Sequence, residues 1–301
     1  MRTRFICVAL VVVDIVCPPW CEAQSIAFPS EIQARQNLAV VSPARTNAIP
    51  FHLAGGFLIQ IEGEIGHLAG LKFILDTGAT HSVIDQKVAN RFSAERRPKK
   101  VFNFDGFVSV DWMEFPYVHF GPIEVHNFSM MVTELSKSSE LIPDADAIIG
   151  LDLLNLASKL GIFYDSKIVV LKPRDANAQG ASREERPECF TVQVMLQGHP
   201  IRLLFDTGME GVLLYEDRIR KHVPEIKFTD VRKDAHQGRL RGKTARLSGL
   251  RLAGSESDVE VFLVKGPRED VLPDIDGYLG TAPLKANIIE LDFAGKTLRW
   301  Q

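Results

Sequence analysis

The sequence is poor in cysteine, and its four cysteines are unevenly placed. Three of them, Cys7, Cys17 and Cys21, lie in the first 23 residues, so removal of that segment would leave Cys189 alone. One thiol cannot form an internal disulfide, and the fold must therefore depend on its apolar core. We expect Cys189 to be a small core or edge residue and not a reactive thiol.

A surplus of charge of one sign is also missing. The chain has 35 basic and 38 acidic residues and a formal net charge of −3. This balance gives no global electrostatic reason to expect nucleic acid or an anionic membrane as a partner. Residues 96–100 form a local basic run around Pro98, which we expect to be a solvated loop.

Long apolar runs are scarce. Residues 5–17 are apolar except for Asp14, follow a cationic start and precede Pro18-Pro19. This layout is typical of a secretory signal peptide, and the run is shorter than the roughly 20 residues that an ordinary transmembrane helix needs. We expect residues 1–23 to be a signal peptide, and the protein to be exported to a periplasmic or extracellular location without a stable membrane span.

The sequence also lacks the patterns of several hydrolytic sites. Its eight histidines show no HExxH or comparable metal-ligand spacing, and G-x-S-x-G is absent. These absences give no reason to expect a metal, a cofactor or a serine nucleophile. Four aspartates, which come as two pairs, are expected to cap backbone groups and not to bind a cation: Asp144 and Asp146, Asp274 and Asp276.

What the sequence does contain is one tripeptide twice. Asp76-Thr77-Gly78 and Asp206-Thr207-Gly208 each follow an apolar run that predicts a buried strand, and they lie 206 − 76 = 130 residues apart. A second landmark, two apolar residues before Gly150, returns before Gly280 with the same offset, 280 − 150 = 130. A lone Asp-Thr-Gly is an ordinary turn. Two coincident offsets indicate a duplicated domain.

The predicted fold is mostly β, with two small barrel-like domains related by a pseudo-twofold axis and a cleft between them. Short strands with turn signals about every ten residues, and few helices, favour this class. The predicted segments are a signal peptide (1–23), an N-terminal arm or pro-segment (24–50), a first domain (51–172), a polar linker (173–188) and a second domain (189–301). Short helices are predicted over 85–90, 151–158 and 216–221, and hairpin turns at Asp105-Gly106 and at 236–238.

A carboxylate on a tight turn after a buried strand is held rigidly, and the glycine lets other backbone or a substrate come close. Two such turns face to face would place Asp76 and Asp206 side by side. Like charges at that separation resist ionising together, so the pair shares one proton and offers a general base and a general acid. The base can activate a water for attack on a peptide carbonyl.

These residues resemble a known family. Residues 73–79 followed by 147–154 closely resemble the retropepsin-type aspartic proteases, which are the standard example of two carboxyls that share a proton. The second repeat resembles them more loosely, and the resemblance covers about 55–171 and 189–301. It implies that this chain is a fused pair of domains that are usually separate subunits.

The resemblance also implies roles for the residues around each aspartate. Thr77 and Thr207 are expected to hydrogen-bond across the pseudo-twofold axis. A hairpin flap over the substrate is expected at Asp105-Gly106 and near 236–238. The residues expected to bind substrate or support the loops are Thr77, Gly78, Ala79, Thr207, Gly208, Asp105 and Gly106.

The second loop departs from the pattern of the family. Met209-Glu210 stands where the first copy has Ala79 and where a small or hydroxylated residue is usual. Glu210 either points into solvent or adds a third negative charge near the pair. The helix after Gly280 is expected to be shorter than its counterpart.

The leading hypothesis is an aspartic endopeptidase that acts on polypeptides as a monomer with an internal pseudo-dimer. One alternative is a non-catalytic peptide-binding protein of the same fold. Another is a protease that is active only as an inter-chain dimer, in which each repeat pairs with its own copy.

Overall fold

The computed structural model describes residues 47–103, 106–135, 144–174, 189–237, 240–252, 255–267 and 274–301. The predicted signal peptide, most of the predicted arm and linker, and Asp105 lie outside the described residues. Within the described ranges, no helix is long and apolar enough to cross a membrane.

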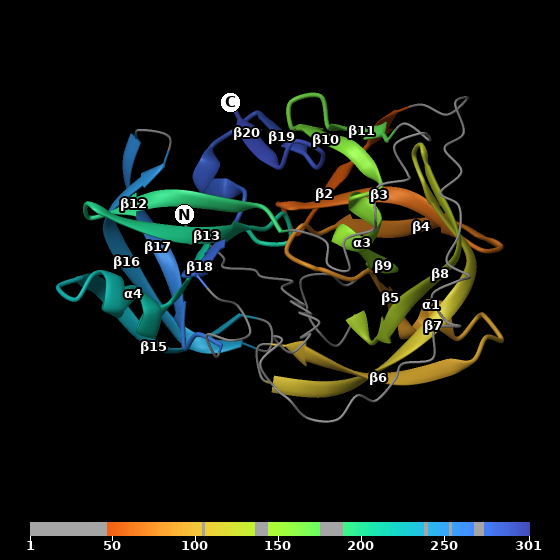
Figure 1. The fold of residues 1–301 in the computed structure, drawn as a ribbon, viewed down its shortest axis with the longest axis horizontal. Helices are drawn as coiled ribbons and strands as arrows, with labels where there is room; N and C mark the ends of the chain where they lie inside the picture. The colour runs from red at the N-terminus through yellow and green to blue at the C-terminus, as the bar shows by residue number, and fades with distance from the viewer. Residues whose placement is uncertain are drawn as a thin grey trace, which may run out of the picture.

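The chain is mostly β and forms two halves that lie side by side (Figure 1). The first half is a sheet of eight strands in the order β2-β3-β4-β9-β5-β8-β7-β6, and the second is a sheet of seven in the order β12-β13-β18-β14-β17-β16-β15. Additional pairings β3–β7 and β12–β16 curl each sheet toward a barrel. The strands of the first sheet are β2 (His52–Ala54), β3 (Leu58–Ile65), β4 (Leu68–Leu75), β5 (Val83–Asp85), β6 (Arg96–Asn103), β7 (Gly106–Phe120), β8 (Ile123–Thr133) and β9 (Ala147–Ile149). Those of the second are β12 (Thr191–Leu196), β13 (His199–Phe205), β14 (Val212–Tyr215), β15 (Phe228–Gln237), β16 (Leu240–Leu252), β17 (Ser255–Val264) and β18 (Gly277–Leu279).

The two landmarks of the sequence are neighbouring strands in each half. β9 runs parallel to β4, with Ile149 opposite Leu75, and β18 runs parallel to β13, with Leu279 opposite Phe205. Each three-residue strand is wholly buried, as its unbroken apolar run predicts. The shared offset of 130 residues therefore reflects one topology built twice.

A third sheet joins the halves across the top of the molecule in Figure 1. Its order is β1-β11-β10-β19-β20, with β1 (Ala48–Pro50), β10 (Ala157–Phe163), β11 (Ile168–Pro173), β19 (Ile288–Asp292) and β20 (Thr297–Trp300). The last three residues of the predicted arm thus form a strand.

The pairing of β10 with β19 shows where the pseudo-twofold axis passes. Leu160 lies opposite Leu291, and Gly161 lies opposite Glu290. An offset of 130 turns residue 160 into 290 and 161 into 291, so it exchanges these two pairs. The axis therefore runs between them, and the strands on either side belong to different halves.

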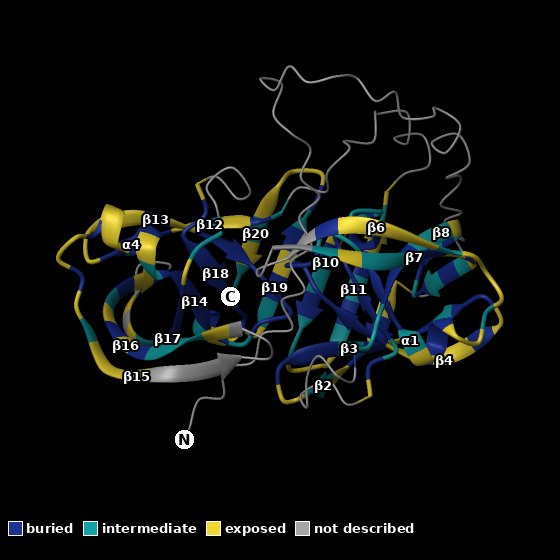
Figure 2. Ribbon diagram, turned by 90° about the horizontal axis from the view of Figure 1, so that it is seen from below, coloured by how far each residue is buried: buried dark blue, intermediate teal, exposed yellow. Residues whose placement is uncertain are grey.

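The core follows from the alternation of the strands. β3 and β4 alternate buried and exposed residues until β4 nears Asp76, where its last three residues are all buried. One large apolar cluster continues through both halves and includes Leu160 and Leu291. Figure 2 shows buried residues along the strands of both halves and exposed residues at outer elements such as α4 and β15.

The helices are short. α1 (Gln86–Ala89) begins as predicted after Asp85, whose side chain accepts a hydrogen bond from the Lys87 backbone N–H at 2.8 Å. The predicted helix over 151–158 is wrong beyond its first turn: α3 (Leu151–Leu154) ends early because β10 begins at Ala157. Its counterpart η3 (Ala282–Leu284) is a single 3₁₀ turn, shorter as predicted.

The prediction of a solvated loop at 96–100 is wrong. These residues belong to β6, an edge strand that pairs with β7. Pro98 lacks the N–H that a central strand needs, and charged side chains suit an edge that must not pair further. The partner strand β7 continues through residues 117–120.

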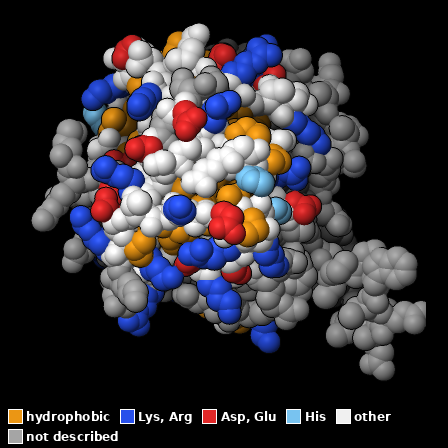
Figure 3. Space-filling model, turned by 90° about the vertical axis from the view of Figure 1, so that its left-hand side faces the viewer, with side chains coloured by type: hydrophobic (Ala, Val, Ile, Leu, Met, Phe, Trp, Pro, Cys, Tyr) orange, Lys and Arg blue, Asp and Glu red, His pale blue; other side chains and the backbone are white. Residues whose placement is uncertain are grey.

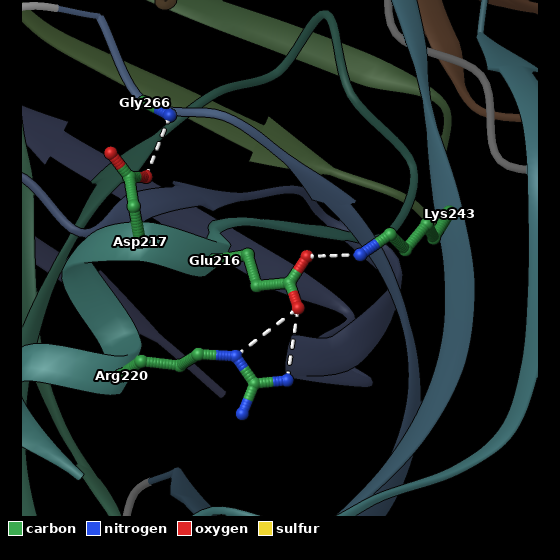
Figure 4. A network of polar contacts seen from close by, with 5 residues as sticks. All are labelled: Glu216, Asp217, Arg220, Lys243 and Gly266. Carbon is green, nitrogen blue, oxygen red and sulfur yellow. Dashed lines mark hydrogen bonds and ion pairs between the residues drawn. The ribbon is translucent and has the colours of Figure 1, made fainter. Parts of the chain in front are cut away.

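Helix α4 (Glu216–His222) is tied to the β15–β16 hairpin by charged side chains (Figure 4). Glu216 accepts hydrogen bonds from Lys243 Nζ of β16 at 2.7 Å and from Arg220 Nη2 at 2.9 Å. Asp217 accepts one from the Gly266 backbone N–H at 2.8 Å. On the side of the molecule drawn in Figure 3, basic and acidic side chains are interspersed, in keeping with the balanced composition.

Replacing Leu291 by Ala should destabilise the whole protein. Leu291 is fully buried in the sheet shared by the halves, and a buried Leu→Ala change costs about 2–5 kcal/mol. Urea unfolding measures the loss, with the exposed Thr297→Ala on β20 as control, expected to cost less than about 0.5 kcal/mol. A loss for Leu291→Ala no larger than the control's would mean that stability does not depend on this sheet.

Candidate active site

Asp76 and Asp206 occupy equivalent places at the ends of β4 and β13. The backbone N–H of Asp76 donates to Ile149 O at 3.0 Å, and that of Asp206 donates to Leu279 O at 3.0 Å. The neighbouring strand, β9 or β18, therefore fixes the point where each chain leaves its sheet.

One oxygen of each carboxyl is held by its own turn. Asp76 Oδ1 accepts hydrogen bonds from the N–H groups of Gly78 at 2.8 Å and Ala79 at 3.1 Å. Asp206 Oδ1 accepts one from the Gly208 N–H at 2.7 Å. These bonds leave the Oδ2 atom of each residue as the one not used by its turn.

The two threonines lock the turns together across the halves, as the resemblance implies. Thr77 N–H donates to Thr207 Oγ1 at 3.1 Å, and Thr207 N–H donates to Thr77 Oγ1 at 3.1 Å. Each hydroxyl also donates to the opposite strand, Thr77 to Phe205 O at 3.1 Å and Thr207 to Leu75 O at 2.8 Å. All four bonds are buried, so neither half can shift without breaking them.

The glycines allow the carboxyls to meet. A Cβ added at Gly78 would lie 2.4 Å from Asp206 Cγ, and one added at Gly208 would lie 2.6 Å from Asp76 Oδ2. No side chain fits at either position. Each carboxyl thus lies against the glycine of the other half, and the structure brings the two Asp-Thr-Gly turns face to face.

The two carboxyl groups are fully buried and in hydrogen-bonding contact with each other. Asp76 Oδ2 and Asp206 Oδ2 nevertheless have no donor among the described residues. Two ionised carboxylates can only accept hydrogen bonds and would repel each other. One added proton gives one of them a donor, so that the contact becomes a hydrogen bond. The geometry therefore favours a single shared proton.

The pKa values agree with this interpretation. Burial, and then the charge of Asp206, raises the pKa of Asp76 well above its usual range. Burial also raises the pKa of Asp206, although hydrogen bonds, the one with Asp76 first, work in the opposite direction. Because the groups interact, they titrate as a pair, and the pair keeps a proton at pH values where an exposed aspartate has lost it.

The departures in the second loop have a structural role. Met209 is buried in an apolar cluster of the second half, at the position that Ala79 occupies in the corresponding cluster of the first. Glu210 is half-buried, and burial raises its pKa. The raised pKa of Asp76 comes first from burial and then from Asp206.

A polar support behind the first loop was not predicted. Ser82 donates to both oxygens of Asp152, from N–H at 2.8 Å and from Oγ at 2.6 Å, and its Oγ accepts the Gly150 N–H at 3.0 Å. The second half has Val212 and Ala282 at these positions, and there Gly280 N–H donates to a backbone carbonyl instead. The sequence signal for this support was the difference between Ser82 and Val212, which occupy equivalent positions 130 residues apart.

The remaining site predictions have mixed outcomes. Asp146 and Asp276 cap backbone groups, since their Oδ2 atoms accept the N–H of Lys72 at 2.8 Å and of Arg202 at 2.9 Å. Cys189 is a half-buried edge residue as predicted, and burial raises its pKa to about 12. No group of metal-ligating side chains occurs within the described ranges.

Only part of each predicted flap hairpin lies within the described residues. Gly106 was predicted to lie in a hairpin turn, but it is the first residue of β7 and pairs with Asn103. Asp105 lies outside the described residues. The second hairpin has Gln237 opposite Leu240.

Residues 61–156 match the family model described as "gag-polyprotein putative aspartyl protease", a segment that contains Asp76. Among solved structures, the chain is similar to EIAV protease complexed with the inhibitor HBY-793, with 13% identity, a TM-score of 0.26, and coverage of 35% of this chain and 92% of that chain. It is also similar to a retropepsin-like aspartic protease from Rickettsia conorii, with 16% identity, a TM-score of 0.30, and coverage of 41% and 87%. No curated protein matches the sequence. The family match covers residues 61–156 only, so it shows a similarity of the first half of the chain to aspartyl proteases.

Replacing Thr207 by Val should loosen the contact between the halves. The change keeps the size of the side chain but leaves Thr77 N–H and Leu75 O without this partner, at a cost of about 1–3 kcal/mol for each buried group. Thermal unfolding measures the loss. Thr207→Ser keeps the hydroxyl and serves as the matched control. Equal stability of the Val and Ser variants would contradict a role for these bonds.

Replacing Asp76 by Asn should stabilise the folded protein at neutral pH. The folded pKa of Asp76 lies above its unfolded value of about 3.9, so the native state binds more protons between these values and stability falls as pH rises. The loss persists at neutral pH and amounts to about 1.4 kcal/mol per unit of pKa shift. The amide of Asn carries no charge, so the variant does not lose this stability as pH rises.

Urea unfolding of parent and variant at pH 4 and pH 7 tests this sign. The parent should lose more stability than Asp76→Asn between the two pH values. A variant that is less stable than the parent at pH 7 would contradict it.

Proposed function

We propose that this protein is an aspartic endopeptidase in which Asp76 and Asp206, one from each half of a single chain, activate a water for peptide hydrolysis. The observation that carries the proposal is the buried contact between the two carboxyls, each against the glycine of the other turn. Their Oδ2 atoms are the polar atoms there that lack a donor among the described residues. A water molecule between the two Oδ2 atoms would supply the missing hydrogen-bond donor.

The chemistry needs one proton on the pair. At the start one carboxyl of the pair holds that proton and the other is a carboxylate. The carboxylate takes a proton from the water as the water oxygen bonds to the carbonyl carbon, and the protonated carboxyl gives its proton to the carbonyl oxygen. The carboxyl that took the water proton then gives it to the amide nitrogen. As the C–N bond breaks, the other carboxylate takes a hydroxyl proton from the tetrahedral intermediate, so the products are a carboxylic acid and an amine and the pair again holds one proton.

The surrounding bonds support this role by fixing the pair before the substrate arrives. The Oδ1 atoms are held by their own turns, and the threonines hold the turns to each other. A site that needs no rearrangement lowers the barrier more than one that must first order its groups.

The pairing within one chain supports activity as a monomer. Both the threonine bonds and the pairing of β10 with β19 join the first half to the second half of the same chain. In the inter-chain alternative, Asp76 would face its own copy and Asp206 would face another, giving two independent sites.

Substitution of either aspartate by Asn should abolish cleavage of a peptide library, with kcat/KM lowered by about 10²–10⁴-fold or more. The matched control is Asp144→Asn, which changes an exposed aspartate next to Lys72 and should leave turnover unchanged. Mass-spectrometric detection of products between pH 3 and pH 7, at a solution mass checked by light scattering, is the measurement.

The outcomes separate the alternatives. Substantial activity in one single variant would favour the inter-chain dimer, because its second site survives. A parent protein that cleaves no peptide, but binds peptides as well as Asp76→Asn does, would favour the non-catalytic binding protein.

A further inference from the structure

The first half carries polar side chains beside its aspartate turn that the second half lacks. Thr80 and His81 follow Ala79 directly, and Trp112 of β7 contacts the ring of His81. The rings of His81 and Trp112 are 5.1 Å apart and meet edge to face at 78°. Trp112 also belongs to the apolar cluster that contains Ala79.

Two polar atoms of this group have no hydrogen-bond partner among the described residues. They are Trp112 Nε1, on a side chain of a residue only 9% exposed, and Thr80 Oγ1. Buried polar atoms are almost always bonded, and an indole N–H can only donate. The missing partner of Trp112 must therefore be a hydrogen-bond acceptor.

The charges nearby favour an anionic acceptor. Lys99 Nζ lies 4.4 Å from the centre of the Trp112 ring, and Lys99 is exposed on the basic edge strand β6. The acidic residue Asp152 has an oxygen 3.7 Å from His81 Nδ1, but both of its oxygens already accept hydrogen bonds from Ser82. Asp152 thus helps to fix His81 and has a structural partner of its own.

The second half offers the opposite surroundings. At the offset of 130, Glu210 stands where the first half has Thr80, and Gly211 where it has His81. A carboxylate at position 210 repels an anionic group, and glycine supplies no ring.

Strand register identifies the counterpart of Trp112. Trp112 lies opposite Met131, which pairs with Val83. In the second half, Thr244 lies opposite Phe262, which pairs with Leu213, the residue 130 after Val83. Thr244 therefore replaces the indole.

We propose that Thr80, His81 and Trp112 form a subsite that binds a carboxylate side chain, Asp or Glu, of the polypeptide substrate on the first-half side of the scissile bond. The inference rests on the proposed function and names a substrate class for that site. Because the second half has Glu210 and lacks the indole, the preference holds on one side only.

The test begins with a peptide library that identifies cleaved sequences. Matched peptides then carry Glu, Gln or Leu at each of the four positions on either side of the bond, and kcat/KM is measured for each. One position, on one side, should favour Glu over Leu by about tenfold or more, with Gln between them. Trp112→Phe keeps the ring and removes the N–H, so it should reduce the Glu-to-Leu ratio about fivefold or more; Thr80→Val should reduce it too.

The matched control is Thr244→Val on β16, which should leave the Glu-to-Leu ratio unchanged. Equal cleavage of Glu and Leu peptides at every position, or an unchanged ratio in Trp112→Phe, overturns the subsite while the proposed function stands. If the parent cleaves no peptide, the proposed function fails. In that case, binding of the same peptides to the parent and to Trp112→Phe, measured by fluorescence anisotropy, tests the subsite alone. Tighter binding of Glu peptides than of Leu peptides, lost in Trp112→Phe, supports the subsite. Equal binding of Glu and Leu peptides overturns it.

Discussion

The structure depends on holding two acidic side chains, buried and in contact, where both burial and mutual repulsion oppose their ionisation. Contacts in the surrounding structure offset this unfavourable free energy. Gly78 and Gly208 remove the side chains that would keep the carboxyls apart, and the turn N–H groups hold one oxygen of each. The site is destabilising by itself and persists because the rest of the fold over-determines it.

Three layers join the halves around this pair: the contact between the carboxyls, the threonine bonds, and the sheet in which β10 meets β19. All three follow the same pseudo-twofold axis. The layers lie along the chain in positions related by the offset of 130, so the topology that the two halves share is enough to place them together. A covalently joined pair also needs no association step before its site exists.

The two halves differ in the residues that support their aspartate turns. Ser82 and Asp152 support the first loop through hydrogen bonds, whereas Val212 and Ala282 leave that place apolar in the second half. Met209 fills space where the first half has Ala79. A dimer of identical chains cannot make such changes on one side only, and in the proposed enzyme this freedom distinguishes the two sides of a substrate.

The sequence by itself determined the repeated turns, the strands that lead to them and the offset, because buried strands and Asp-Thr-Gly turns leave local apolar and glycine patterns. Local pattern failed at 96–100, where an edge strand looked like a loop, and at 151–158, where β10 ended a helix that the sequence allowed to continue. Only the tertiary structure decided that each carboxyl meets the glycine of the other half, and that Trp112 lies against His81. Both depend on contacts between segments far apart in the chain, whose geometry no local pattern encodes.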